Sequence, residues 1–185
     1  RIGSMVMGLL GVFRRKPHER AGFGLYGAAV AAARQPELFG PEAAPDTLDG
    51  RFDVVAAHVA VVIRRVRRDP DPRGKDLAQA VFDAMFADMD INLREMGVSD
   101  LAVGKRVKRM WEAFHGRAAA YEAALDAGDA AGLAAALARN VWRGTAPEGA
   151  AERLAARLQA AGEALAAQPF ASLLAGEARF PGIPA

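Results

Sequence analysis

DAMFADMDINLREMGVSDLAVGKRVK, residues 83–108, is the stretch from which the fold is most directly predicted. Its first half has apolar residues at helical spacing, which predicts a helix over residues 75–96. Gly97 is the residue type that ends helices in the left-handed conformation, and Ser99 or Asp100 is suited to cap the next helix. The stretch therefore predicts two helices that meet at a compact turn.

The helix predicted over residues 75–96 has two apolar faces of different character. One face combines Leu77, Ala80, Val81, Ala84 and Ile91, and the other combines Phe82, Phe86, Met89, Leu93 and Met96. Methionine and phenylalanine side chains adapt to varied partners, so the second face is a candidate binding surface, although packing in the core is the simpler interpretation. The following helix, residues 101–127, has one narrow apolar stripe, and basic residues project from its other side.

Further helices are predicted outward from this stretch over residues 23–34, 51–68, 130–142 and 152–168, with a short turn from 169 to 174. The helix over 51–68 is apolar nearly all round, which predicts a central position in the bundle. Residues of high strand propensity gather only in short valine runs that also have helical spacing. We therefore expect an all-α fold, a single compact bundle of about six helices with flexible N- and C-terminal tails.

The chain of 185 residues is interpreted as one domain with flanking segments. Residues 1–4 resemble a cloning scar ahead of a native start at Met5, and residues 5–20 form an apolar and then basic N-terminal segment. Residues 21–175 form the helical domain and residues 176–185 a C-terminal tail. The apolar run at residues 5–13 is too short to span a bilayer, and both a disordered terminus and a contact with an anionic membrane surface stay open for it.

The composition argues against most enzymes and metal proteins. The chain has no cysteine and only three histidines, so it lacks the ligands for a thiolate metal site and has few residues from which a nucleophilic triad could be built. The motifs GxxxxGK[ST], GxGxxG, HExxH and GxSxG are absent. We expect no catalytic residues, no metal and no cofactor, and we interpret His58 as a hydrogen-bonded histidine at the boundary of the core.

Basic residues cluster at 64–68 and 105–109, although the formal net charge is only +2. Each cluster fits either an anionic partner, such as RNA or a membrane, or a solvated helix face. Arg94 follows Asp90 by four residues and is placed to pair with it. A helical nucleic-acid or ribosome-binding module stays open as an alternative function, but DNA is not an expected partner because the basic helix is longer than a typical recognition helix.

Three segments of the chain resemble the ubiquinol-cytochrome c chaperone family, the assembly factors of ubiquinol-cytochrome c reductase. They are LYGAAVAAAR (residues 25–34), DTLDGRFDVVAAHVAVVIRRV (46–66) and the stretch from LAQAVFDAMF to AAAYEAAL (77–125). The resemblance rests most strongly on Asp49, Arg51, Asp83, Asp90, Arg94, Glu95 and Gly97, together with Lys105 and Lys108. Gly104 departs from the pattern, because a more rigid residue such as proline is expected there.

The resemblance implies a non-enzymatic chaperone that binds newly made cytochrome b and supports assembly of the reductase. The implied partners are nascent cytochrome b, the ribosome exit region, a small partner protein and an anionic membrane surface. The implied location is the cytoplasm, including a peripheral position on the inner face of the cytoplasmic membrane.

These implications lead to a hypothesis for the site. We expect the client to contact the apolar residues Phe86, Met89, Leu93 and Met96. We expect the anionic surface or partner to contact Lys105, Lys108 and Arg109. The family residues Asp49, Arg51, Asp83, Asp90, Arg94, Glu95 and Gly97 are assigned structural roles that fix the turn and the hinge.

Overall fold

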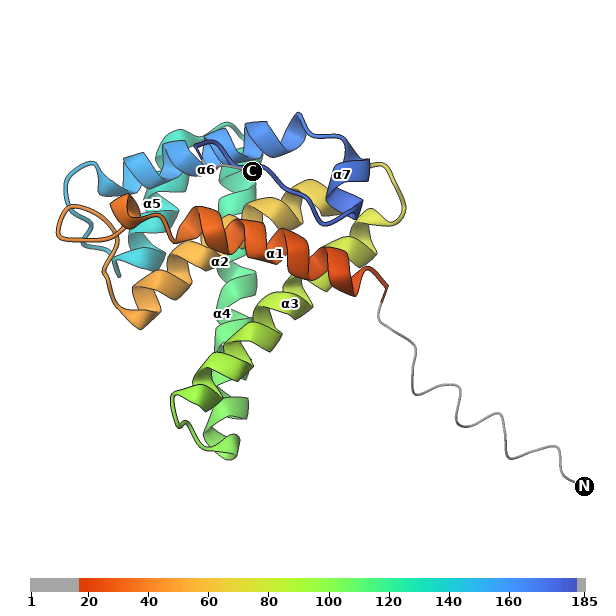
Figure 1. Ribbon diagram of the computed structural model, residues 1–185. Coiled ribbons are helices and arrows are strands. Elements are labelled where there is room, and N and C mark those ends of the chain that lie inside the picture. Colours follow the sequence, from red (N-terminus) through yellow and green to blue (C-terminus); the bar gives the residue numbers. More distant parts are fainter. Residues whose placement is uncertain (1–16, 183–185) are drawn as a thin grey trace, which may run out of the picture.

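The computed structural model describes residues 17–182, and within them the chain is all-helical with no strand (Figure 1). The helices are α1 (Glu19–Ala33), η1 (Pro36–Leu38), α2 (Leu48–Arg67), α3 (Gly74–Glu95), α4 (Asp100–Asp126), α5 (Ala130–Val141), α6 (Ala150–Ala166) and α7 (Phe170–Leu174). The predicted all-α bundle is confirmed. The expected cloning scar, most of the N-terminal segment and the last residues of the tail lie outside the described residues.

Helix α2 occupies the centre of the bundle because it is apolar on all sides. Val54, Val59 and Val61 are buried although they point in different directions from the helix axis. The helix contacts α1, α3, α4, α5 and α6. It starts at Leu48, three residues before the predicted start at residue 51, because Thr47 caps the helix: its Oγ1 accepts a hydrogen bond from the amide of Gly50 (3.1 Å).

Helix α1 crosses α3 at short range, and a glycine makes this possible. A Cβ atom on Gly22 would lie 2.5 Å from the carbonyl carbon of Ala80. The alanines that follow on α1, Ala29, Ala32 and Ala33, are buried in the same interface region of the core. Small residues on α1 therefore set the distance at which α3 packs, and with it the position of the groove described below.

Two polar side chains of α2 are buried. Asp53 is bonded to Arg117 of α4 and accepts a hydrogen bond from Arg143 (2.9 Å); burial raises the pKa of Asp53, and the two arginines oppose this effect. His58 has Nδ1 2.8 Å from the carbonyl oxygen of Val54, and burial lowers its pKa to about 4. The predicted hydrogen bond of His58 is present, but the predicted place at the core boundary is wrong because the residue is fully buried.

Helices α3 and α4 meet at a hinge that projects from the rest of the molecule (Figure 1). Gly97 has φ of 79°, the left-handed conformation that the sequence predicts. The amide of Gly97 bonds to the carbonyl of Arg94 (2.9 Å) and the amide of Val98 to that of Leu93 (3.1 Å), which satisfies the end of α3. The hinge is therefore a defined helix cap.

The segment after α7 has no helix, yet it packs against the bundle. Phe180 is buried in the core. The side chain of Gln168 donates to the carbonyl of Arg179 (2.9 Å) and accepts from its amide (2.8 Å). The expected C-terminal tail is thus packed against the bundle at Arg179 and Phe180.

Candidate functional site

An open groove of about 410 Å³ lies beside the hinge, between α2, α3 and the start of α4. Its apolar wall comes from three helices and consists of Leu48, Phe52, Val55, Met89, Leu93, Met96 and Met110. Its polar lining consists of Tyr26, Arg34, Asp49, Arg51, Asp88, Asn92, Glu95 and Arg106. We call this feature the methionine groove, after the three methionines in its wall.

Three of the four residues expected to contact a client line this groove. Met89 and Leu93 form its buried base, and Met96 is 56 % exposed at its edge. Phe86 does not line it and is instead half-buried, with its ring centroid 4.6 Å from that of Phe82. The expected contact set is therefore brought together only in part, and Phe86 belongs to a different cluster.

A second exposed apolar side chain of the groove comes from the start of α2. Leu48 is the first residue of that helix and is 48 % exposed. Leu48 and the half-exposed Met96 both line the groove, so together they give it an apolar surface that a partner can reach. Leu48 was not expected as a site residue because its neighbours in sequence indicate only a helix start.

The polar lining is internally bonded. Tyr26 Oη donates to Asp88 (2.6 Å), and burial followed by this carboxylate raises the pKa of Tyr26. Asp49 lies 3.9 Å from Arg106 of α4. Arg106 was also not expected at the site, although it precedes Met110 by four residues and so lies on the same side of α4. These pairs connect α1 with α3 and α2 with α4 around the groove.

The family residues near the turn before α2 and at the hinge have local partners. Arg51 bonds to Asp46 (2.6 Å) and lies over the ring of Phe39, 5.0 Å from its centroid. Arg94 pairs with Asp90 (2.7 Å), as the spacing predicts, and also bonds to Asp100 across the hinge. The guanidinium of Arg94 thus joins α3 to the first turn of α4, while Glu95 is exposed and lines the groove.

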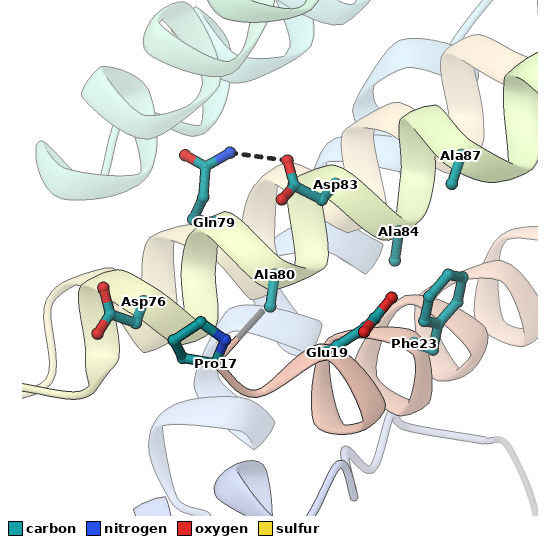
Figure 2. A pocket seen from close by; sticks show the side chains of 9 residues that line it. All are labelled: Pro17, Glu19, Phe23, Asp76, Gln79, Ala80, Asp83, Ala84 and Ala87. Carbon is teal, nitrogen blue, oxygen red and sulfur yellow. Dashed lines mark hydrogen bonds between the residues drawn. The ribbon is translucent and has the colours of Figure 1, made fainter. Parts of the chain in front are cut away.

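Asp83 does not line the methionine groove. It lies in a separate cleft of about 220 Å³ between the start of α1 and α3, where Figure 2 shows it with Glu19, Asp76 and the ring of Phe23. Its carboxylate accepts a hydrogen bond from Gln79 (2.9 Å). The acidic cleft is therefore a neighbour of the site on another side of α3.

The cations expected to face an anionic partner lie on the outside of α4. Lys105, Lys108 and Arg109 are all exposed, and none of them lines the methionine groove. Lys108 Nζ is 4.0 Å from Glu112, a solvent-exposed pair that contributes little to stability. These side chains are available for contacts outside the groove.

The basic cluster at 64–68 is used within the fold. Arg64 and Arg68 pair with Asp126 at the end of α4, and Arg67 pairs with Glu122. Arg65 donates to Asp69 (2.7 Å) and also to main-chain carbonyls in and after α6. All four arginines of this cluster therefore have acidic partners within the fold, while Arg67 and Arg68 also stay exposed to solvent.

Within residues 17–182, the structure has neither a cluster of three or more potential metal ligands nor a helix suited to span a membrane. No group of three or more histidine, aspartate or glutamate side chains within residues 17–182 is placed to hold a metal ion. In the same residues, no helix combines the length and the apolar character that crossing a bilayer requires. The methionine groove is lined by apolar side chains together with polar and charged ones.

Comparisons with known proteins agree on one family. The sequence profile of the ubiquinol-cytochrome c chaperone family matches residues 43–180. Among solved structures, the chain resembles the crystal structure of the Cbp3 homolog from Brucella abortus, with 36 % sequence identity and a TM-score of 0.77 over 92 % of this chain and 95 % of that one. No curated protein sequence matches the chain. The profile match covers α2 to α7 and the whole apolar wall of the methionine groove, and the chain therefore belongs to the ubiquinol-cytochrome c chaperone family.

Proposed function

We propose that the chain is a non-enzymatic assembly chaperone that binds newly made cytochrome b in the methionine groove and so supports assembly of ubiquinol-cytochrome c reductase. The observation that carries the proposal is the open apolar groove beside the hinge, lined by residues on which the family resemblance rests. Membership in the family supports the chaperone role, and the groove supports a location for client contact.

The groove has the properties that a reversible binder of apolar segments needs. Thioether side chains are flexible and fit varied surfaces, and Met89, Met96 and Met110 supply three of them. Leu48 and Met96 are each about half exposed, so covering them stabilises a complex by about 1 kcal/mol per side chain. Together with the rest of the apolar wall, this binding free energy is enough to hold an apolar segment, and it is small enough for the segment to be released.

The rim of the groove carries both signs of charge. Arg34, Arg51 and Arg106 line the groove together with the acidic residues Asp49 and Glu95. Membrane segments are flanked by polar and charged residues, with an excess of lysine and arginine on the cytoplasmic side. Charged residues of both signs at the groove can pair with the residues that flank a membrane segment, while the apolar wall contacts the segment itself.

The exposed cations of α4 are proposed to make a second contact. Lys105, Lys108 and Arg109 lie outside the groove and face solvent. Their proposed partner is anionic and lies where cytochrome b is made: the ribosome exit region, the membrane surface or a small partner protein. This arrangement fits a protein of the cytoplasm that acts at the inner face of the membrane.

The test uses the exposed edge of the groove, where substitutions leave the fold intact. Leu48→Glu and Met96→Glu each place a charge in the apolar wall, and Ile91→Glu places one on α3 outside it at similar exposure (54 %). In pull-downs from native membranes, we expect the first two variants to recover cytochrome b at least about tenfold less than wild type, since burying a charge adds to the lost apolar contact. Recovery by Ile91→Glu should equal that of wild type.

A second variant separates the proposed contacts from the nucleic-acid alternative. Lys105→Glu/Lys108→Glu is expected to weaken recovery of cytochrome b from ribosome and membrane fractions in a salt-dependent way, while purified client segments still bind. Recovery of bulk RNA without cytochrome b by wild type would favour a nucleic-acid or ribosome-binding module. Equal losses in Ile91→Glu and Met96→Glu would show that the groove is not the client site.

A further inference from the structure

A second groove, of about 570 Å³, is lined by residues of α2, α3 and α4. Its residues on α3 and α4 lie farther from the hinge than those of the methionine groove, on the parts of the two helices that diverge in Figure 1. Its floor is made by Ile63 of α2 with alanines of α3 and α4, and its walls are aromatic. We call it the aromatic groove and define it by Phe82, Trp111, Phe114 and His115. Its volume falls within the roughly 300–1,000 Å³ typical of cofactor and small-molecule sites.

The aromatic rings form one connected cluster. The centroid of the Phe82 ring is 6.2 Å from that of Trp111, which it meets edge-on, and 5.7 Å from that of Phe114. Trp111 remains 45 % exposed. Aromatic side chains bury well and gain from stacking, so an indole left half in solvent over a groove favours a flat apolar ligand.

His115 adds an imidazole to this wall. Its ring lies nearly parallel to Phe82, with centroids 5.2 Å apart, and edge-on to Trp111 at 4.3 Å. The aromatic contacts thus orient the ring, yet within residues 17–182 neither of its nitrogens has a hydrogen-bond partner. An imidazole that ring contacts hold in one orientation, with no hydrogen bond to its nitrogens, is suited to bind a metal.

Cations stand at the rim of the groove near the start of α3. Lys75 is exposed and makes no ion pair among the described residues, and Arg67 is paired with Glu122. The rim therefore suits a ligand with an anionic edge, such as one bearing carboxylates.

We propose that the aromatic groove binds an iron porphyrin, with His115 as its single axial ligand. The macrocycle lies against Trp111 and Phe82, and its propionates face Lys75. A histidine on one side of the iron and an open groove on the other make this an exchangeable ligand, and the proposal departs here from the sequence-based expectation of no cofactor. The proposal does not depend on cytochrome b binding, because it concerns a different groove and is tested on the purified chain alone.

The test is a titration of the purified full chain with Fe(III) protoporphyrin IX, followed by the Soret band. Wild type is expected to saturate at one equivalent, with the band shift that imidazole coordination produces. His115→Ala should lose that shift and bind at least about tenfold more weakly. The control is His18→Asn, which removes the other accessible imidazole with a residue that tolerates the positive φ at that position (62°), and it should behave as wild type.

Two further measurements assign the parts of the site. Metal-free protoporphyrin IX should bind wild type and His115→Ala equally, because stacking does not require iron. Lys75→Glu should weaken binding of the iron porphyrin without moving its band. Binding that does not saturate at one equivalent, or an identical spectrum in His115→Ala and wild type, would overturn the proposal.

Discussion

Acidification should destabilise this protein through one buried side chain, His58. The pKa of His58 falls from its ordinary value of 6.5 to about 4 on folding, because the ring is buried and its charged form is poorly solvated. Between these values the unfolded chain binds a proton that the folded chain excludes, so stability is full above pH 6.5 and is lost as the pH falls toward 4. From pH 7 to pH 4.5 the loss from this group is about 2 kcal/mol, at 1.36 kcal/mol per pH unit.

The measurement compares urea unfolding of wild type and His58→Leu across this pH range, followed by tryptophan fluorescence. Trp142 is a suitable reporter, since it is buried and its Nε1 donates to the carbonyl of Ala43 (3.0 Å). His58→Leu should lack the loss of about 2 kcal/mol, and His18→Asn should retain it. An unchanged pH dependence in His58→Leu would refute the assignment to this residue.

Three further predictions concern the packing that positions the grooves. Asp53→Ala should cost about 3 kcal/mol in urea unfolding, because it leaves two arginines without their buried partner; a cost below that of a typical surface substitution would contradict this. Gly22→Ala should lower stability by about 1–3 kcal/mol because the new methyl group meets the backbone of Ala80. Gly27→Ala, with open space around it, should stabilise α1 by up to about 1 kcal/mol. Equal melting temperatures for the two variants would show that the close contact with Ala80 does not decide the effect. Gly97→Ala should lower stability by about 1 kcal/mol through its positive φ and leave far-UV circular dichroism unchanged; a stability equal to wild type would show that the turn relaxes.

Local signals in the sequence predicted most of the fold. The apolar surround of α2 predicted its central place, and the glycine after Met96 predicted the end of α3 and the hinge. The Asp90 and Arg94 pair followed from helical spacing alone. Each of these features is decided by residues within a few turns of one another, which is the range over which a single sequence is informative.

The rest of the site depends on contacts between distant segments. Leu48 and Met96 both line the methionine groove although they are far apart in the chain, and Arg106 lines it from a third helix. The basic cluster at 64–68 finds its acids on α4, which no spacing within α2 indicates. Phe86 has the same pattern signal as Met89, but it packs against Phe82 because α4 covers that side of α3.

Both grooves are lined by residues of α3 and α4, so one change in the angle between these helices would alter both. The α3 and α4 helices are joined at the hinge by Arg94 and packed together by the ring of Phe114, which is buried between them.

The central claim is that cytochrome b occupies the methionine groove, and site-specific photo-crosslinking to newly made cytochrome b tests it most directly. A photoreactive residue at position 96 or 48 should crosslink to cytochrome b, and one at position 91, equally exposed but outside the groove, should not. Crosslinks of equal strength at 91 and 96, or at 91 alone, would contradict the account.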